Sequence, residues 1–594
     1  MKQLKSIFLL PALALLLLIT SSRPLSAQGF LRAAGKEIVD GAGRSVLLRG
    51  MGLGGWMLQE PYMLQLSGAA INQADIRKKI EALIGHDRTV QFYDAWLTNF
   101  CRKTDIDSLA AWGFNSIRLP MHYNLFTLPV DEEPVTGKQT WLPKGFQLVD
   151  TLLSWCRSNH IYLILDLHAA PGGQGADRAI SDRDTTKPSL WQSSANRAKT
   201  IALWKQLATR YANEPWIGGY DLINETNWGF QDPADKNGCA EATNAPLRQL
   251  LVDITAAIRT VDRNHLIFLE ANCWGNNYKG ILPAWDSNLA ISFHKYWNDN
   301  NQGSIQQFID MREQYKIPVW MGESGENSNS WFRSAISLLE RNDIGWAWWP
   351  LKKMGMNNPF QVQSNDGYRA LVAYWKGQGS KPSASDAFSA LMELAASTRT
   401  ERTIYHADVI DAMFRQVTRP EARPFALNHI GREAMLFAVN YDIGPLGEAY
   451  FSMDSANYRV STGKDIPWNR GWTYRNDGID IETCTDTASN GFQVDGLKSS
   501  EWLQYTVYAA QTGVYDLQVR VKSPAAATLA LIVNQSAASR LDLAHGTSGW
   551  TSGRIPRISL RKGENKIRLA ATSGELSLSY LQFTRQAGMP AGTN

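Results

Sequence analysis

From about Arg44 to Lys352 the chain alternates short apolar runs with longer amphipathic stretches. The amphipathic stretches predict helices, for example Gly145–Asn159, Ala195–Ala212, Ala245–Val261 and Trp331–Asn342. Most of the apolar runs are nearly continuous, which is typical of strands buried on both faces of a parallel sheet. The predicted strands are Ser45–Met51, Asn115–Pro120, Tyr162–His168, Ile217–Asn224, His265–Glu270, Ala290–Tyr296, Val319–Glu323 and Gly345–Trp349.

Strands alternating with helices in this number predict an α/β fold, a (β/α)8 TIM barrel. A doubly wound open sheet is the alternative, but no switch-point motif favours it. The stretch Gly50–Gly55 formally matches the dinucleotide motif G-x-G-x-x-G. Pro61 follows where a helix should be running, and the next strand comes about sixty residues later instead of closing a compact βαβ unit. We therefore interpret this stretch as a glycine-rich turn at the barrel mouth.

The alternation of apolar runs and helical stretches ends at Arg419–Pro424, where two prolines interrupt it. Short runs separated by Gly, Ser and Asn follow, and several of them alternate apolar with polar residues, which predicts an all-β, jelly-roll-like sandwich. The expected organisation is a signal peptide at 1–27, a barrel domain at 28–418, a linker at 419–433, a sandwich at 434–586 and a tail at 587–594. Two further helices, at Tyr368–Trp375 and Ala387–Ser397, are expected to pad the barrel.

The N-terminus carries Lys2 and Lys5, then the apolar run Ile7–Ile19, then Leu25-Ser-Ala27. This pattern predicts a cleaved secretory signal, because the run is shorter than the roughly 20 residues that span a bilayer. No other run reaches membrane length. We expect a secreted or periplasmic protein, a monomer without a membrane span.

Composition narrows the class of partner. The formal net charge is +4, and removal of Lys2, Lys5 and Arg23 leaves +4 − 3 = +1, so no basic excess points to nucleic acid. The chain has 22 Trp, whose flat apolar faces with one polar edge suit sugar rings. None of the five Cys shows zinc spacing. Because Cys239 and Cys273 fall in loops after neighbouring strands, we predict a disulfide between them.

Chemically active side chains recur at the carboxyl ends of the predicted strands, which in a TIM barrel meet on one face. Burying such groups for packing alone would cost several kcal/mol each if they stayed unpaired. Two of them are carboxylates, the minimum equipment for hydrolysing a glycosidic bond. These residues are Arg118, His168, Asn224, Glu225, His294, Tyr296, Glu323 and Trp349.

In this order and on these strands, the residues resemble glycoside hydrolase family 5 over about residues 30–418. The resemblance implies a retaining enzyme with Glu225 as acid/base and Glu323 as nucleophile, and it needs no metal or cofactor. Arg118 and Tyr296 would then support the charge of Glu323.

The other strand-end residues take supporting roles under the same resemblance. Asn224 is expected to bind the substrate 2-hydroxyl, His168 and His294 to hold hydroxyls and order the acids, and Trp349 to form a floor under the reacting sugar. Glu270 is a further site candidate. We interpret Asp166 and Asp221 as supporting or structural residues, and Glu326 as a loop residue.

The substrate is expected to be a β-glucan of open linkage. Leu53-Gly-Gly-Trp56 and the Glu60-Pro61 pair resemble the exo-β-1,3-glucanase branch, in which the acid before the proline closes a glucose pocket. An exo-β-1,3-glucanase or β-glucosidase is therefore the alternative. A glycan-binding protein on an inactive barrel and a transglycosylase are more remote alternatives.

The sandwich resembles carbohydrate-binding module family 6, most specifically in Tyr474–Glu482. The resemblance implies Tyr474 and Trp550 as sugar-binding aromatics. The position of the family's usual asparagine holds Ser577, and the first strand lacks the acids that often bind calcium there. A sandwich that only buttresses the barrel is the alternative.

Overall fold

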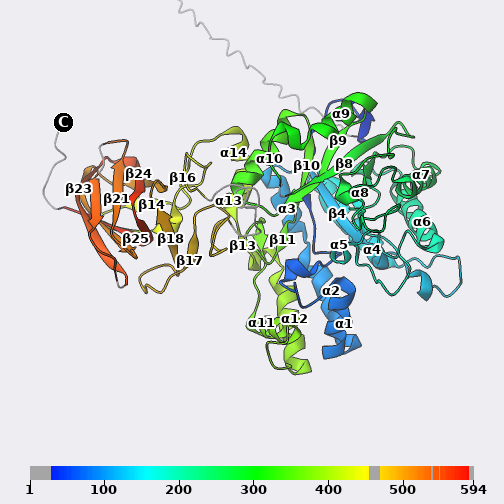
Figure 1. Cartoon of the computed structure of the whole chain (residues 1–594), viewed down its shortest axis with the longest axis horizontal. Helices are drawn as coiled ribbons and strands as arrows, with labels where there is room; N and C mark the ends of the chain where they lie inside the picture. The colour runs from blue at the N-terminus through cyan, green and yellow to red at the C-terminus, as the bar shows by residue number, and fades with distance from the viewer. Residues whose placement is uncertain (1–28, 297, 454–467, 537–538, 548, 587–594) are drawn as a thin grey trace, which may run out of the picture.

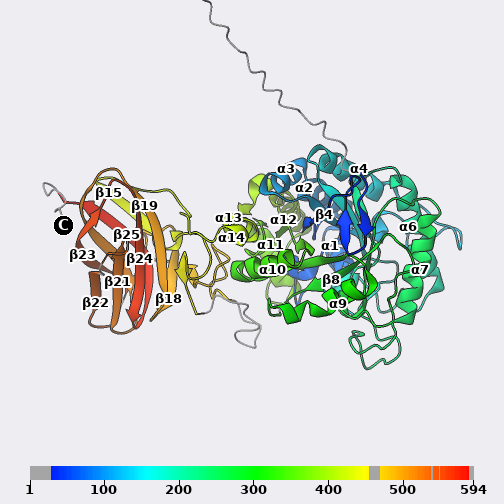
Figure 2. The same cartoon turned by 90° about the horizontal axis from the view of Figure 1, so that it is seen from above.

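The computed structural model describes residues 29–296, 298–453, 468–536, 539–547 and 549–586. The expected signal peptide and C-terminal tail lie outside these ranges. Two lobes lie side by side, an α/β lobe from the first two thirds of the chain and an all-β lobe from the last third (Figure 1; Figure 2). Within the described ranges, none of the helices is both long and apolar enough to cross a bilayer.

The α/β lobe is built on a closed barrel of parallel strands in the order β10-β3-β4-β5-β6-β7-β8-β9. The predicted TIM barrel is confirmed, and every barrel strand overlaps a predicted one. Strands β4, β5, β6 and β8 to β10 are buried along their whole length, as their continuous apolar runs indicate. The barrel strands are β3 (Arg49–Gly52), β4 (Ser116–His122), β5 (Tyr162–Ala169), β6 (Ile217–Asp221), β7 (Ile267–Glu270), β8 (Leu289–Lys295), β9 (Val319–Gly325) and β10 (Gly345–Trp349).

Helices surround the barrel, and the predicted helices are all present to within about two residues of their expected ends, the usual uncertainty of a helix boundary. The longer ones are α1 (Gln73–Ile84), α2 (His86–Phe100), α3 (Lys103–Trp112), α4 (Pro143–Ser158), α6 (Ser194–Tyr211), α7 (Ala245–Arg259), α9 (Gln306–Tyr315), α10 (Asn329–Arg341), α11 (Asp366–Trp375) and α12 (Ala384–Ser397). The short ones are α5 (Arg178–Ser181), α8 (Asn272–Gly275), α13 (Ala407–Met413) and α14 (Arg415–Thr418).

Helix α10 shows how local sequence sets an element next to the site. Ser328 caps it, because its side chain accepts a hydrogen bond from the backbone NH of Trp331. Its buried face includes Trp331, Phe332, Ile336 and Leu339, spaced three or four residues apart as an amphipathic helix requires. The helix therefore begins four residues after β9 and anchors the loop between them.

The Gly50–Gly55 turn lies at the barrel mouth as predicted, and it makes room for Trp349. A Cβ atom at Gly54 would lie 2.4 Å from Cη2 of Trp349, and one at Gly52 would lie 3.1 Å from Cε3. Such contacts are too close for any side chain. The glycines thus let the backbone approach an aromatic ring, which is a packing role and not a phosphate-binding one.

The all-β lobe is a sandwich of two six-stranded sheets around its own apolar core. One sheet runs β14-β19-β24-β21-β22 with β16 added on β19, and the other runs β17-β18-β25-β20-β23 with β15 added on β25. Strand β14 falls inside the expected linker and pairs with β19. The strands are β14 (Asn428–Ile430), β15 (Glu433–Phe437), β16 (Tyr450–Phe451), β17 (Ile481–Thr483), β18 (Phe492–Lys498), β19 (Trp502–Ala509), β20 (Gly513–Lys522), β21 (Ala527–Val533), β22 (Ser539–Leu543), β23 (Thr551–Leu560), β24 (Gly563–Ser573) and β25 (Glu575–Arg585).

The predicted disulfide between Cys239 and Cys273 is confirmed, with their Cα atoms 4.7 Å apart. It joins the loops that follow β6 and β7. Cys101, Cys156 and Cys484 carry free thiols. The bond therefore ties together the segments just beyond Glu225 and Glu270.

Candidate active site

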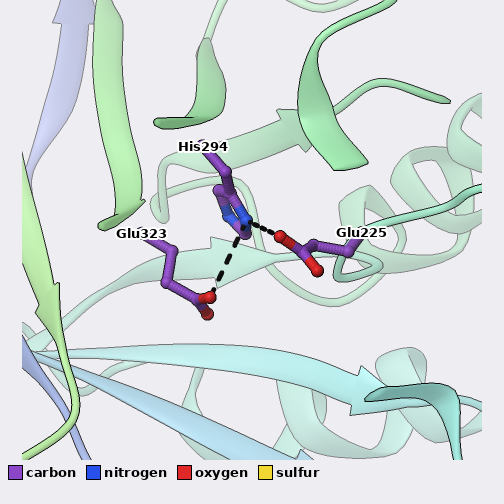
Figure 3. Close-up of side chains that lie close together, drawn as sticks. All are labelled: Glu225, His294 and Glu323. Atoms are coloured by element: carbon purple, nitrogen blue, oxygen red, sulfur yellow. Dashed lines mark hydrogen bonds and ion pairs between the residues drawn. The ribbon is translucent and has the colours of Figure 1, made fainter. Parts of the chain in front are cut away.

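Glu225, His294 and Glu323 meet at the carboxyl end of the barrel (Figure 3). Glu323 lies in β9, His294 in β8, and Glu225 in the loop after β6. One carboxylate oxygen of each glutamate and one ring nitrogen of the histidine all lie within 4.8 Å of one another. Each glutamate is 6% exposed. This spacing suits a retaining glycosidase, whose two carboxyl groups lie about 5–5.5 Å apart, whereas inverting enzymes need about 6.5–9.5 Å.

The position of Glu225 depends on a strained turn. Its φ angle is 41°, in the left-handed region that costs a non-glycine residue about 1–2 kcal/mol. Its backbone NH donates a hydrogen bond of 2.7 Å to Oε2 of Glu270. Glu270, a buried residue at the end of β7, therefore holds the turn that presents Glu225.

Arg118 is the centre of the buried charge network under the site. Its guanidinium contacts Glu323 at 2.6 Å, Glu270 at 2.8 Å, Asp221 at 2.9 Å and Asp166 at 3.2 Å. Burial alone would lower the pKa of Arg118, but these carboxylates raise it, so the guanidinium stays charged. One cation thus serves four carboxylates, and the aspartates predicted to be supporting residues lie directly against it.

The carboxylates around Arg118 do not share its charge equally. Burial raises the pKa of Asp166 and Asp221 above the ordinary range. Burial also acts on Glu270, but His294 and Arg118 outweigh it and lower the pKa of Glu270 to about 2. The network therefore lowers the pKa of Glu270 but leaves the pKa values of the two aspartates above their ordinary value.

Glu323 makes both contacts that the sequence predicts for a supported nucleophile. Oε2 accepts from Nη1 of Arg118 at 2.6 Å, and Oε1 accepts from the hydroxyl of Tyr296 at 2.9 Å. Burial and the neighbouring carboxylates raise the pKa of Tyr296, so its hydroxyl keeps its proton and remains a donor. The carboxylate is thereby held in one orientation with two charge-stabilising donors.

His294 lies between Glu225 and Glu270. Its Nδ1 lies 2.6 Å from Oε1 of Glu225, and its Nε2 lies 3.2 Å from Oε1 of Glu270. Burial alone would lower the pKa of His294, but the carboxylates of Glu270, Glu323 and Glu225 raise it well above the ordinary value. The imidazole bonds to Glu225 through Nδ1 and so fixes the Glu225 side chain, while its Nε2 faces Glu270 as an ion-pair partner.

Asn224, His168 and Trp349 form one further connected wall. The amide oxygen of Asn224 accepts from Arg118 at 2.8 Å, and its amide nitrogen lies 3.2 Å from Nε2 of His168. The other ring nitrogen of His168 lies 2.7 Å from Asp166. The His168 and Trp349 rings stack at 5.1 Å with an interplanar angle of 4°. All the strand-end residues singled out in the barrel therefore belong to one contiguous site.

Three residues of the site were not predicted. The Tyr62 hydroxyl accepts from Nε1 of Trp349 at 2.7 Å, and the Lys353 ammonium lies 5.4 Å from the Tyr62 ring centroid. Lys353 also forms an ion pair with Glu326. Glu326, interpreted from the sequence as a loop residue, therefore belongs to a charge pair beside the site. Their signal in the sequence was weak, because each only follows a site residue by two to four positions.

Glu60 lies at the same face, 6% exposed, with Oε1 3.9 Å from Nε2 of His168. Burial, together with the carboxylates of Glu323, Glu326 and Glu225, raises the pKa of Glu60 well above its ordinary value. A protonated Glu60 is a hydrogen-bond donor as well as an acceptor, which suits a sugar hydroxyl.

This pKa shift predicts that Glu60→Gln stabilises the fold, since glutamine keeps a neutral donor without requiring a bound proton. The folded protein holds the Glu60 proton more tightly than the unfolded chain does, so wild-type stability falls as pH rises from the unfolded pKa towards the raised folded one. We expect the variant to melt at a higher temperature than wild type at pH 7 and at about the same temperature at pH 4. Thermal unfolding at both pH values measures this, and an equal or lower melting temperature at pH 7 would contradict it.

The clustered acids and histidine could in principle bind a metal ion, but their ligand atoms are already used inside the protein. Arg118 and Tyr296 occupy the two oxygens of Glu323, and Glu225 and His294 bond to each other. Glu225 and Glu323 are therefore bonded to protein side chains, as an acid/base and nucleophile pair requires.

Residues 73–355 match the family model described as cellulase (glycosyl hydrolase family 5). This part of the barrel is similar to glycoside hydrolase family 5. Members of family 5 are retaining glycosidases, and the glycosidase class predicted from the strand ends is confirmed. The matched segment covers β4 to β10 and so includes all the site residues except Glu60 and Tyr62.

Several curated relatives match this chain. A β-xylosidase of Phanerodontia chrysosporium is 27% identical over 58% of this chain and 75% of its own. Endoglucanase C of Acetivibrio thermocellus is 23% identical over 45% and 87%. A probable glucan 1,3-beta-glucosidase A of Aspergillus niger is 26% identical over 31% and 42%. The predicted likeness to the exo-β-1,3-glucanase branch is thus supported alongside likeness to other activities.

The sandwich matches a different family from the predicted one. Residues 475–583 match the model of carbohydrate binding module family 35, so the family 6 assignment was wrong. The family 6 prediction rested on short residue motifs, and many such modules share the antiparallel sandwich fold. The aromatic motif Tyr474–Glu482 did not carry enough information to separate them.

The structure does not bring the two expected sugar-binding aromatics together. Tyr474 packs on Phe492 at the start of β18, and its hydroxyl donates to Asn440 at 2.6 Å. Trp550 directly precedes β23 and lies under Lys522. Strands β25 and β20 lie between β18 and β23, which separates the two rings by several strand spacings of about 4.8 Å. A sugar clasped between them is therefore not supported.

Proposed function

We propose that Glu323 is the nucleophile and Glu225 the acid/base of a double-displacement glycosidase. In the first step an oxygen of Glu323 attacks the anomeric carbon while the proton of Glu225 passes to the leaving glycosidic oxygen. In the second step Glu225 takes a proton from water, the water oxygen attacks the anomeric carbon, and Glu323 is released. The observation that carries this assignment is the pair of carboxylates within 4.8 Å, of which Glu323 bonds to Arg118 and Glu225 bonds to His294.

The other site residues support this chemistry by position. Arg118 and Tyr296 each donate a hydrogen bond to Glu323 and hold it aligned. Asn224, fixed by two neighbours, keeps an amide hydrogen for the substrate 2-hydroxyl, a contact that strengthens towards an oxocarbenium-like transition state. The Trp349 ring, supported by His168 and Tyr62, offers a flat floor for the reacting sugar.

We propose a β-glucan as the substrate and export from the cell, with the sandwich as a carbohydrate-binding domain. Two of the relatives are named for action on glucans, and the sandwich matches a binding-module family. The buried Glu60 at the same face favours an exo-acting variant of this function, because a polar side chain that closes the sugar pocket would bind the end of a glucan chain. The domain limits 28–418 and 434–586 and a monomeric state complete the proposal.

Product analysis tests the proposal directly. The panel is β-1,3-, β-1,4- and mixed-linkage glucans, with aryl β-glucoside and aryl β-xyloside as small substrates. Release of glucose alone from the β-1,3-glucan is expected for the exo-acting enzyme. A ladder of oligosaccharides would point to endo action, and cleavage of the xyloside alone would overturn the glucan assignment.

A further inference from the structure

The all-β lobe contacts the barrel at the loop that follows the nucleophile strand. Asn476, which precedes β17, is fully buried, and its side-chain amide donates to the backbone oxygen of Asn327 at 2.9 Å and to Oδ1 of Asn329 at 3.0 Å. Its backbone oxygen accepts from the NH of Asn329 at 3.0 Å, and its backbone NH donates to Asp408 at 2.9 Å. One asparagine of the sandwich lobe thus makes four hydrogen bonds to the catalytic lobe.

The barrel side of this contact is also buried. Asn327 is 0% exposed and Asn329 2% exposed, at the end of the β9–α10 loop and the start of α10. The amide nitrogen of Asn329 donates to Asp408 at 2.7 Å and to Asp477 at 3.3 Å. A buried polar group that loses its hydrogen-bond partner costs about 1–3 kcal/mol. The bonded contact between the two lobes is therefore more stable than a separated one.

The loop held by Asn476 carries part of the active site. Glu326 directly precedes Asn327, has a φ angle of 55°, and pairs with Lys353. Lys353 lies against Tyr62, and Tyr62 accepts the hydrogen bond from the indole of Trp349. A left-handed non-glycine residue persists only where its surroundings fix it. The bonds to Asn327 and Asn329 provide that fixation.

Within the all-β lobe, Asn476 is held by further contacts. The amide oxygen of Asn476 accepts from the indole NH of Trp468 at 3.2 Å. Next to it, Arg475 is fully buried, lies 3.6 Å from the Tyr441 ring centroid, and bonds to the backbone oxygen of Asp442 at 3.0 Å. Asn476 is therefore a fixed point of the sandwich and not a flexible contact.

We propose that the sandwich lobe is a positioning element of the active site, and that Asn476 is a positioning residue for the β9–α10 loop. Through this loop it holds the Glu326–Lys353 pair, and with it the Tyr62 and Trp349 wall, in register with Glu323. The lobe thus contributes to turnover itself, in addition to any binding of polysaccharide. The inference rests on the proposed role of Glu323.

The test compares turnover of a small soluble substrate with that of a glucan, in the full chain. Asn476→Ala is expected to lower kcat on the aryl β-glycoside that wild type cleaves at least tenfold, with KM changed less than threefold, because misplacement of groups by about 1 Å can cost up to 100-fold in rate. A lobe that only anchors the enzyme to polysaccharide would leave this small substrate unaffected.

Asn565→Ala is the matched control. Asn565 is also fully buried in the sandwich, and its amide donates to two backbone oxygens, those of Arg561 and Gly563, within the same lobe. We expect its kcat on the small substrate to stay within twofold of wild type. Circular dichroism and thermal unfolding establish that each variant is folded.

A second variant approaches the same bond from the barrel side. Asn329→Ala should also lower kcat, and the double variant with Asn476→Ala should be no worse than the poorer single variant, because both remove one shared interaction. If Asn476→Ala does not fold, Asn476→Ser is held to the same tenfold threshold.

Two results would overturn the inference: kcat within twofold of wild type for the folded Asn476 variant, or an equal loss in Asn565→Ala. Failure of the proposed function is a separate outcome. In that case wild type itself would cleave none of the β-glycosides in the panel.

Discussion

Glu323→Gln is expected to lower kcat at least about 10⁴-fold while leaving the fold intact, because the amide has nearly the same shape but is a poor nucleophile. Its two donors, Arg118 and Tyr296, can still bond to the amide oxygen. Steady-state kinetics on the best aryl β-glycoside measures the loss. The matched control is Glu340→Gln, since Glu340 is also paired with an arginine, Arg49 at 2.7 Å, and comes from the end of α10.

The roles of the two glutamates can be separated by adding azide to the alanine variants with an activated aryl β-glycoside. In Glu323→Ala, azide attacks the anomeric carbon from the vacated nucleophile side, the aryl oxide leaves, and an α-glycosyl azide forms. In Glu225→Ala the glycosyl-enzyme still forms, and azide then displaces Glu323 to give a β-glycosyl azide. The opposite stereochemical pattern would exchange the two roles, and residual turnover above 1% in Glu323→Gln would exclude a nucleophile there.

Arg118→Met is expected to lower both stability and activity. It leaves four buried carboxylates without their shared cation, and removing one partner of a buried ion pair typically costs about 3–5 kcal/mol. The loss should be largest at neutral pH. Glu270 has its pKa lowered to about 2 partly by Arg118, so in wild type its stabilising contribution is complete above the unfolded pKa and is lost as pH falls towards 2.

The difference in unfolding free energy between wild type and Arg118→Met should therefore shrink as pH falls below about 4, where the carboxylates can take up protons. Urea unfolding at pH 7 and pH 3 measures it. Arg259→Met is the control, because Arg259 pairs with the partly exposed Asp286 in one ion pair, at 2.9 Å. If Arg118→Met is as stable as Arg259→Met, Arg118 is not the charge centre of the site.

The barrel and its catalytic face were largely predictable because the signals are local. Each strand reads as an apolar run, and Arg118, His168, Glu225 and Glu323 follow or end such runs. Parallel strands in a barrel all present their carboxyl ends to one face, so topology alone brings these residues together. The same reasoning gave the disulfide between Cys239 and Cys273, since loops after neighbouring strands lie close to each other.

The parts that were missed depend on side-chain direction and on loops. Glu326 lies beyond its strand, and only the positive φ angle and the pair with Lys353 turn it towards the site. Tyr62 becomes relevant only through the Trp349 indole. The module family was assigned wrongly because short motifs such as Tyr474–Glu482 do not separate families that share the sandwich fold.

The sequence by itself determined the barrel, its strand order along the chain and the two carboxylates at its carboxyl end, because hydrophobic periodicity and chain order encode them directly. The tertiary structure alone decided how one arginine serves four acids, which way Glu225 turns, and where the second lobe holds the nucleophile loop. These features join residues far apart in the chain, such as Asn327 and Asn476, which are 149 positions apart. No local pattern records such a contact, since it arises only when two separately folded cores are packed together.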